Sequence, residues 1–330
     1  MPVLDPQALL DERVGAIRRF HSHVRSDRAE LDLSGGVDSA TLLGLLVRAL
    51  GPDNIVTVYS SIHSSTDSRD RARAAAEAFG VPLVELDLTA MFDGLIADMR
   101  AALVASGRSA EALEARIAAD PTVLGSIRSC IRAPIGRGFN RMTGGGIRHG
   151  TGNECEDRWL RFYQKGGDGE VDTNPIAMLS KGEVYQLAKA LGVPRSVIDA
   201  LPSPDLHGTG EAHNDEDEIR ALTGVDWTYS RIDWETGAYT KVGTIELLSR
   251  FLDDHPELLR DGDLPEPELL ALARAAAPLF GRSEAVTSTF LESARRLEKA
   301  SRHKANPNIP ALGERSHLVA AGLLTNELPR

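Results

Sequence analysis

The chain has 330 residues, of which 42% are hydrophobic, and this is enough apolar material for a large buried core. Its net charge of −11 argues against broad nucleic-acid binding, because a polyanion would be repelled without a strong basic patch. No signal-peptide pattern and no apolar run of membrane-spanning length occurs, so a cytoplasmic protein is expected. The two cysteines form no C-x-x-C pair, which argues against a disulfide framework or a cysteine zinc site.

The first part of the chain alternates strand and helix patterns. Asp5 and Pro6 predict the start of an amphipathic helix that continues to residue 25, because apolar residues recur there at helical spacing. The elements that follow are expected at residues 31–33 (strand), 38–50 (helix), 55–61 (strand), 67–79 (helix) and 82–88 (strand). This order predicts an α/β fold with a doubly wound parallel sheet, which binds ligands at the carboxyl ends of its strands.

The stretch Ser-Gly-Gly-Val-Asp-Ser at residues 34–39 joins the first strand to its helix. Its two glycines let the backbone bend sharply, so that N–H groups of the turn and of the first helical turn can approach an oxyanion. Asp38 suits an anion site only if a divalent cation lies between its carboxylate and the phosphates. The turn therefore predicts a magnesium nucleotide site, and it matches neither the Walker loop nor the dinucleotide fingerprint.

The middle of the chain is expected to be mainly helical. Helices are predicted over residues 89–142, with Pro134 interrupting what would otherwise be one long element. An apolar strand is expected next, but residues 143–150 are rich in glycine and polar, so their conformation stays open. Residues 165–175 hold three glycines and a proline, which predicts a loop.

The last part of the chain is predicted to hold further helices. Ser180 is expected to cap a helix that ends near Leu191, with Glu183 completing a capping box. Residues 201–218 are expected to form a loop that ends in a solvated acidic helix start, and two or three helices should follow over 245–304. Two parts are therefore expected, an α/β domain over 1–220 and a mainly helical part over 221–330 that packs on the same domain.

A second candidate for chemistry is Thr-Gly-Asn-Glu-Cys-Glu at residues 151–156, between the uncertain strand and a helix. Its hydroxyl and backbone donors could face the same crevice as the 34–39 turn. Of its two carboxylates, that of Glu156 is the better candidate for a second metal ligand.

Five motifs occur in order: S-G-G-V-D-S (34–39), G-T-G-N-E-C-E (150–156), K-G-G-D-G-E-V-D (165–172), L-S-K (179–181) and P-S-P-D-L (202–206). The first resembles the pyrophosphate loop of the N-type ATP pyrophosphatases, and the whole series resembles ammonia-dependent NAD synthetase over residues 5–220. The resemblance implies the ATP pyrophosphatase fold with a helical C-terminal extension. It also implies the use of ATP and Mg²⁺ to amidate nicotinic acid adenine dinucleotide through an acyl adenylate, in a homodimer with the substrate pocket at its interface.

The resemblance assigns roles to individual residues. The implied catalytic residues are Asp38, Lys165 and Lys181, and the implied magnesium ligands are Asp38 and Glu156. The implied ATP-binding residues are Ser34, Gly35, Gly36, Val37, Asp38, Ser39, Thr151, Lys181 and Ser203. The implied contacts of the dinucleotide substrate are Lys165, Asp168, Asp172, His303 and Lys304.

The differences from the family pattern lie on the substrate side. Gly166 stands where the family usually has an aromatic residue, Glu170 stands where it has a small one, and residues 143–150 lack the usual apolar strand. An amide ligase for another carboxylate in specialised metabolism therefore stays open. So do a tRNA-modifying ATP pyrophosphatase, which the acidic charge and missing C-x-x-C pairs disfavour, and a non-catalytic nucleotide-binding module. Because the ATP loop begins at residue 34, no glutaminase domain is expected, and free ammonia or a separate glutaminase would supply the nitrogen.

Overall fold

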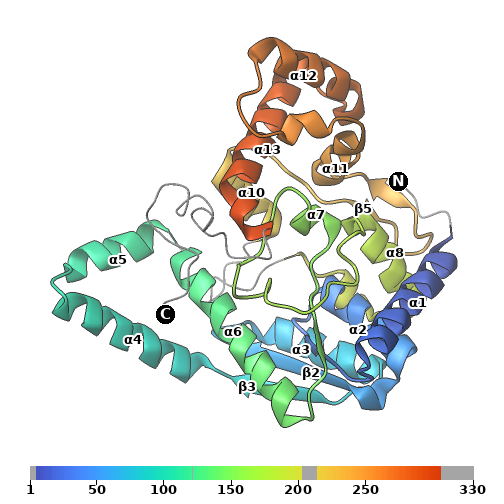
Figure 1. The fold of residues 1–330 in the computed structure, drawn as a ribbon, viewed down its shortest axis with the longest axis vertical. Coiled ribbons are helices and arrows are strands. Elements are labelled where there is room, and N and C mark those ends of the chain that lie inside the picture. Colours follow the sequence, from blue (N-terminus) through green and yellow to red (C-terminus); the bar gives the residue numbers. More distant parts are fainter. Residues whose placement is uncertain (1–4, 121, 203–213, 306–330) are drawn as a thin grey trace, which may run out of the picture.

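The structure is a computed structural model that describes residues 5–120, 122–202 and 214–305. A parallel sheet of four strands lies at its centre, with the strands in the order β3-β2-β1-β4 (Figure 1). The strands are β1 (Ala29–Asp32), β2 (Ile55–Ser61), β3 (Leu83–Asp87) and β4 (Ile147–His149). In register, Ala29 of β1 pairs with Ile55 of β2 and with Ile147 of β4. The predicted α/β fold class is confirmed.

The largest core lies against this sheet. It combines buried side chains of β1 with those of four helices, α1 (Pro6–Val24), α2 (Val37–Leu50), α3 (Thr66–Ala78) and α8 (Lys181–Leu191). The predicted N-cap of α1 is present, because the Asp5 carboxylate accepts the N–H groups of Gln7 and Ala8 at 3.0 Å. The predicted capping box of Ser180 and Glu183 at the start of α8 is present as well.

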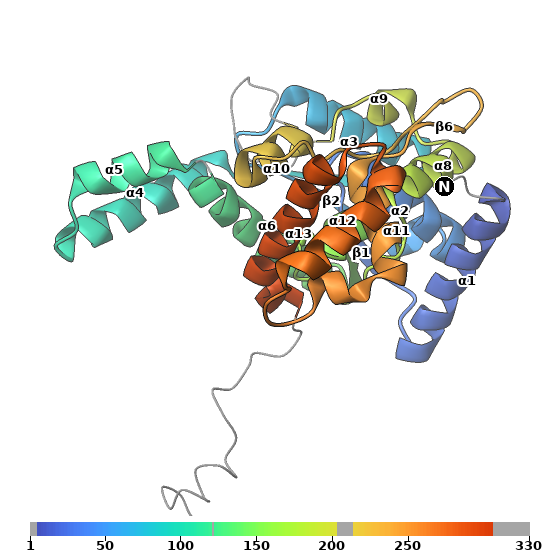
Figure 2. The ribbon, with the colours of Figure 1, turned by 90° about the horizontal axis from the view of Figure 1, so that it is seen from above.

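Two helices project from the body as an arm, α4 (Thr89–Ala105) and α5 (Ala110–Ala119) (Figures 1 and 2). The chain then returns along α6 (Thr122–Met142), which packs against β1 and β2. The prediction that Pro134 interrupts this segment is wrong, because α6 continues through it. A proline removes one backbone hydrogen bond from a helix, and here the packing of α6 on the sheet outweighs that loss.

The glycine-rich segment before residue 150 ends in a short strand. Gly144, Gly145 and Gly146 all have positive φ, and a Cβ on Gly146 would lie 2.7 Å from the carbonyl oxygen of Arg28. Strand β4 follows, but its central side chain is Arg148, which is buried between the carboxylates of β1. The strand is thus polar at its centre, which is why no apolar strand pattern occurs here.

The C-terminal helices share a second core with residues of the first part. Trp159 lies 4.7 Å from Trp227 between ring centroids, and Trp227 lies 4.8 Å from Phe290. The α-helices and strands not yet named are α7 (Glu154–Asp157), α9 (Arg195–Ile198), α10 (Asp215–Thr223), β5 (Arg231–Ile232), β6 (Tyr239–Lys241), α11 (Thr244–Asp254), α12 (Glu266–Phe280) and α13 (Glu284–Ala305). Of these, α9 packs in the first core. Helices are confirmed over most of 245–304, and a boundary at residue 220 stays a prediction. In the described parts of the chain, every helix is too short or too polar to span a bilayer.

Candidate active site

The 34–39 turn lies at the carboxyl end of β1, as predicted, and leads into α2. Gly35 has a φ of +82°, and a Cβ there would lie 2.2 Å from the carbonyl oxygen of Ser68, so the turn needs glycine at this position. The hydroxyl oxygens of Ser34 and Ser39 lie 3.1 Å apart, and Ser39 donates to the Gly36 carbonyl at 3.1 Å. Because no side chain caps α2, the N–H groups of its first turn can serve an anion.

An acid–lysine cluster, formed by Asp38, Asn153, Glu156 and Lys181, lies beside this turn. The Lys181 Nζ atom donates to Asp38 Oδ2 at 2.6 Å and to Glu156 Oε1 at 2.9 Å. Asn153 donates from Nδ2 to the second oxygen of Asp38 at 3.0 Å. The first turns of α2, α7 and α8 thus meet, and three residues predicted separately from the sequence are in contact.

The electrostatics of the cluster follow from burial. Only 2% of the Lys181 side chain is exposed, and burial disfavours its charge, but the carboxylates of Asp38 and Glu156 raise its pKa well above the usual value. Burial raises the pKa of Glu156, and the ammonium of Lys181 opposes that shift. The charge of Lys181 is therefore stabilised by two acidic side chains, one of which, Asp38, belongs to the 34–39 turn.

Three further residues of this site were not singled out from the sequence. Asn153 is the N-cap of α7 and accepts the N–H group of Cys155 at 3.0 Å while it positions Asp38. Asp215 belongs to the acidic run, yet it is buried, and burial raises its pKa to about 8. The ring of Tyr229 lies 5.1 Å from Lys181 Nζ, and its buried hydroxyl has no hydrogen-bond partner among the described residues.

Only one of these three residues carried a local signal. An asparagine directly before a helical segment is a capping residue, so Asn153 could have been found. Asp215 is hidden in a run of four acids, and the position of Tyr229 depends on tertiary packing.

The loop over residues 163–172 contains three of the predicted contacts of the dinucleotide, which would accept the amide nitrogen, and we call it the acceptor loop. Its two aspartates hold it in place. Asp168 Oδ1 accepts the Ser129 hydroxyl and the Gln164 N–H group, each at 2.8 Å. Asp172 Oδ2 accepts from Arg137 Nη1 at 2.8 Å and from the Arg148 N–H group at 2.9 Å. These bonds join the acceptor loop to α6 and β4.

Asp157 connects the acceptor loop with the acid–lysine cluster. Burial raises its pKa to about 7, and the carboxylates of Glu156, Asp168 and Asp38 act in the same direction. Its Oδ2 atom accepts from Asn174 Nδ2 at 2.8 Å. The loop and the cluster therefore lie within electrostatic range of each other at one edge of the sheet.

Gly166 and Glu170, the two residues of the acceptor loop that differ from the family pattern, have conformations that the structure explains. Gly166 has a φ of +81°, which an aromatic residue would adopt only with strain. The Glu170 side chain is 58% exposed, and its carboxylate lies 3.8 Å from Arg137 Nη2. Its charge is thus turned to solvent and partly balanced.

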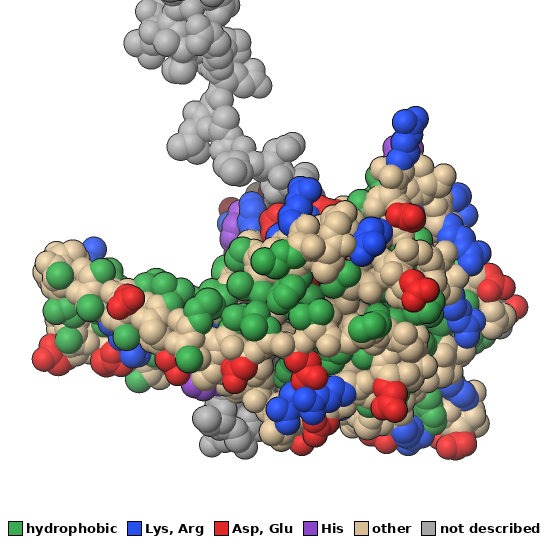
Figure 3. Space-filling model, turned by 90° about the horizontal axis from the view of Figure 1, so that it is seen from below, with side chains coloured by type: hydrophobic (Ala, Val, Ile, Leu, Met, Phe, Trp, Pro, Cys, Tyr) green, Lys and Arg blue, Asp and Glu red, His purple; other side chains and the backbone are tan. Residues whose placement is uncertain are grey.

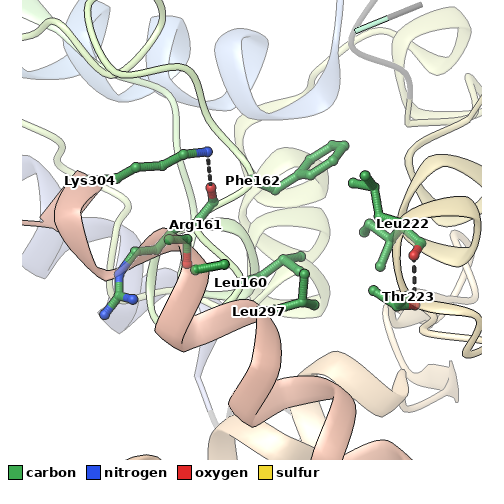
Figure 4. A pocket seen from close by; sticks show the side chains of 10 residues that line it. Leu160, Arg161, Phe162, Leu222, Thr223, Leu297 and Lys304 are labelled. Atoms are coloured by element: carbon green, nitrogen blue, oxygen red, sulfur yellow. Dashed lines mark hydrogen bonds between the residues drawn. The ribbon is translucent and has the colours of Figure 1, made fainter. Parts of the chain in front are cut away.

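His303 and Lys304, the predicted basic contacts of the substrate, lie at the end of α13, and Lys304 binds backbone carbonyls of the same chain. Lys304 Nζ donates to the carbonyl oxygen of Arg161 at 3.1 Å (Figure 4) and to that of Tyr163 at 2.7 Å. Burial lowers the pKa of this ammonium. His303 is exposed, and Lys165 donates to its carbonyl oxygen at 3.3 Å. One carbonyl partner of Lys304, that of Tyr163, lies at the start of the acceptor loop, and the other, that of Arg161, lies two residues earlier.

Thr151 and Ser203 are the predicted ATP contacts that lie outside both the 34–39 turn and the acid–lysine cluster. Thr151 is half-buried and lies in the chain between β4 and α7, two residues before Asn153. Ser203 lies outside the described residues. Their roles stay predictions.

A glycine turn at the carboxyl end of a central parallel strand, beside fixed carboxylates and a buried lysine, defines an enzyme-like site for a phosphate-bearing ligand. The particular family follows from sequence comparison. The model of the NAD synthase family matches residues 10–234, and the chain belongs to this family.

Individual relatives agree with this family. The chain is 33% identical over 207 residues to an NH3-dependent NAD(+) synthetase of Methanococcoides burtonii, covering 62% of this chain and 69% of the relative. It is 30% identical over 251 residues to the protein of the same name from Vibrio cholerae, covering 71% and 83%.

Solved structures agree at the level of the fold. The NMN synthetase of Francisella tularensis superposes with a TM-score of 0.65 at 18% identity, covering 94% of this chain and all of that one. The NH3-dependent NAD synthetase of Campylobacter jejuni gives 0.58 at 19% identity with the same coverage.

Proposed function

We propose that this chain is a ligase that forms a C–N bond, amidating nicotinic acid adenine dinucleotide with ammonia while ATP is cleaved to AMP and pyrophosphate. The observation that carries the proposal is the contact of Asp38, Glu156 and Lys181 beside the 34–39 turn in a member of the NAD synthase family. These three residues come from three of the motifs that suggested this function, those at 34–39, 150–156 and 179–181.

The proposed reaction needs no nucleophile from the protein. The acceptor carboxylate attacks the α-phosphorus of ATP, the bond to the bridging oxygen breaks, and pyrophosphate leaves. Ammonia then attacks the acyl carbon, AMP leaves, and the added nitrogen loses a proton to give the amide. Positioning and charge stabilisation account for such a transfer.

The residues of the turn are proposed to hold the nucleotide. Backbone N–H groups and hydroxyls of Ser34, Gly35, Gly36, Val37 and Ser39 would bind the departing pyrophosphate. Lys181 would stabilise the charge that develops at the α-phosphate, and Thr151 and Ser203 would contact the nucleotide. Lys165, Asp168 and Asp172 would position the acceptor, with His303 beside them.

Mg²⁺ is part of the proposal, and the donor set fits it. This ion usually takes one or two carboxylates together with substrate phosphates, and Asp38 and Glu156 offer two carboxylates beside the anion turn. Among the described residues no group of three or more acidic, histidine or cysteine side chains forms a complete cation site, so the phosphates would supply the other ligands. Bound there, the ion would neutralise phosphate charge.

The orientation of Glu170 favours the dinucleotide over another carboxylate as the acceptor. A carboxylate that pointed into the site would repel a pyrophosphate-bearing substrate, but this side chain is exposed and lies near Arg137. An amide ligase for a different acceptor is therefore the less favoured alternative.

Ammonia is the proposed nitrogen donor. Glutamine hydrolysis of the usual kind needs a reactive thiolate, and burial raises the pKa of both Cys130 and Cys155. A separate glutaminase could supply ammonia to the chain. Both thiols are free, which suits the reducing cytoplasm proposed as its location.

A homodimer is proposed from the arm. Met91, Leu95, Met99 and Leu103 recur every four residues along α4, and each side chain is at least 39% exposed. In Figure 3, apolar side chains extend from the arm onto the adjacent body. An apolar stripe on a projecting helix is typical of an interface, and a second copy of the chain is the proposed partner.

The proposed function is tested with the purified chain, ATP, Mg²⁺, ammonium and nicotinic acid adenine dinucleotide. NAD should form, and glutamine in place of ammonium should give none. Other pyridine carboxylates, including the mononucleotide, serve as competing acceptors. If one of them is amidated faster than the dinucleotide, the alternative acceptor replaces the proposed one.

A further inference from the structure

The end of α13 and the start of the acceptor loop hold each other. Lys304 donates to the carbonyl oxygen of Arg161 (Figure 4) and to that of Tyr163. In the opposite direction, Lys165 donates to the carbonyl oxygen of His303. The Lys304 ammonium also lies 5.6 Å from the centroid of the Tyr163 ring. Charged donors make stronger hydrogen bonds than neutral ones, so these crossed contacts fix the segment over 161–165 against the helix.

A buried carboxylate six residues before Lys304 in α13 anchors the same segment. Only 5% of Glu298 is exposed, and its Oε1 atom accepts from Arg161 Nη1 at 3.0 Å and from Arg302 Nε at 2.9 Å. Arg161 Nη1 also donates to the Glu298 carbonyl oxygen at 3.2 Å. A single buried acid thus receives two guanidinium groups, one from its own helix and one from the segment before the acceptor loop.

The backbone of Arg161 has an unusual conformation, which the contact with Glu298 helps to hold. Its φ is +49°, in the left-handed region that a residue with a Cβ seldom adopts. Such a conformation persists only where the surroundings enforce it, and Arg161 is held through its guanidinium by Glu298 and through its carbonyl by Lys304. Arg161 lies two residues before Tyr163, where the acceptor loop begins.

We propose that Glu298 is a positioning residue for the acceptor: through Arg161 it sets the start of the acceptor loop and thereby the places of Lys165 and Asp168. This inference rests on the proposed function for the identity of the acceptor. Helix α13 would then influence substrate binding without touching the substrate. This helix follows the region that the NAD synthase family model matches. Lys304 acts in the same way, as a strut for the loop.

The test compares Glu298→Gln with Glu292→Gln, the same substitution at an exposed position of the same helix. Glu298→Gln should raise the KM for nicotinic acid adenine dinucleotide about tenfold, because displaced binding groups lose their alignment, while the KM for ATP and kcat change less than about twofold. Glu292→Gln should change neither constant. Lys304→Met should repeat the effect of Glu298→Gln, and it covers the case in which the latter fails to fold.

A second measurement needs no substrate. Amide hydrogen exchange in residues 161–170 should quicken in Glu298→Gln and Lys304→Met, while exchange in α2 and β1 stays at the wild-type rate. Equal rises in both KM values, or unchanged exchange in 161–170, would overturn the inference. If the wild type makes no NAD, the proposed function fails, and the exchange measurement still decides whether Glu298 fixes the loop.

Discussion

Lys181 joins two carboxylates that the sequence separates by more than a hundred residues. Its ammonium is within hydrogen-bond distance of Asp38 and Glu156, and it is almost fully buried. Loss of either carboxylate would leave this charge with one anion, so the cluster behaves as a unit. Each member is therefore worth more to the site than an exposed ion pair would be.

The first prediction concerns Asp38→Asn. The substitution preserves volume and removes the charge that faces Lys181 and the proposed cation, so turnover should fall by about a hundredfold or more. Thermal unfolding should still be cooperative. Asp53→Asn is the matched control and should keep full activity. Asp53 is exposed and lies just before the amino end of β2, away from the carboxyl ends of the strands. Near-normal turnover of Asp38→Asn would refute the metal and phosphate assignment.

Asp172→Ala tests the other side of the site. The Asp172 carboxylate binds both Arg137 and the backbone of Arg148, so its loss frees the end of the acceptor loop. The KM for the dinucleotide should rise about tenfold and the KM for ATP much less, as steady-state kinetics with each substrate varied will measure. Equal effects on both substrates would mean that the loop serves ATP as well.

At the scale of elements, strands β1 and β4 are joined by a buried charge cluster. Arg148 Nη1 lies 2.6 Å from Glu30 Oε1, and its other terminal nitrogen bonds Asp32. Gly136 makes room for this guanidinium, since a Cβ there would lie 1.8 Å from it. Arg148 also donates to the Glu170 carbonyl oxygen at 3.2 Å, so one side chain connects the sheet with the acceptor loop.

This cluster should make stability depend on pH. Burial and the nearby Asp32 carboxylate raise the pKa of Glu30 from 4.5 to about 7, although the Arg148 guanidinium acts in the opposite direction. The folded chain then binds a proton that the unfolded chain releases, so this stabilisation is complete below about pH 4.5 and is lost as the pH rises to about 7. Glu30→Gln should flatten that decline in thermal unfolding between pH 5 and 8. An unchanged slope would show that Glu30 is ionised throughout.

The sequence predicted elements well where local signals agree. The 34–39 turn and the capping box of α8 are found as expected, because glycine geometry and capping are local. Strand β4 could not be recognised, since its buried Arg148 is balanced by partners more than a hundred residues away. For the same reason Asp215 and Tyr229 were not found, as their burial comes from packing of the C-terminal part.

At the scale of the molecule, the arm of α4 and α5 contributes little to either of the larger cores. No side chain of α5 is buried, and only Phe92 and Ile96 of α4 are. Phe92 and Ile96 pack with side chains of α6 in a small separate core, while the apolar stripe of α4 is exposed and forms the proposed dimer interface.

The arm leads to a prediction on assembly. The double substitution Leu95→Glu and Met99→Glu places two charges in the proposed interface and should convert a dimer into a monomer, as light scattering after gel filtration will measure. Leu279→Glu, at a comparably exposed position of α12, is the control and should leave the dimer intact. A monomeric wild type, or a dimer that survives the double substitution, would contradict this account of the arm.

The proposed enzyme activates a carboxylate with ATP and lets ammonia attack the acyl adenylate in the same site. The most direct measurement follows AMP, pyrophosphate and NAD together during turnover with ammonium and nicotinic acid adenine dinucleotide. The three products should appear in equal amounts, and omission of the dinucleotide should stop AMP formation. ADP as the nucleotide product, or AMP released without NAD, would contradict this mechanism.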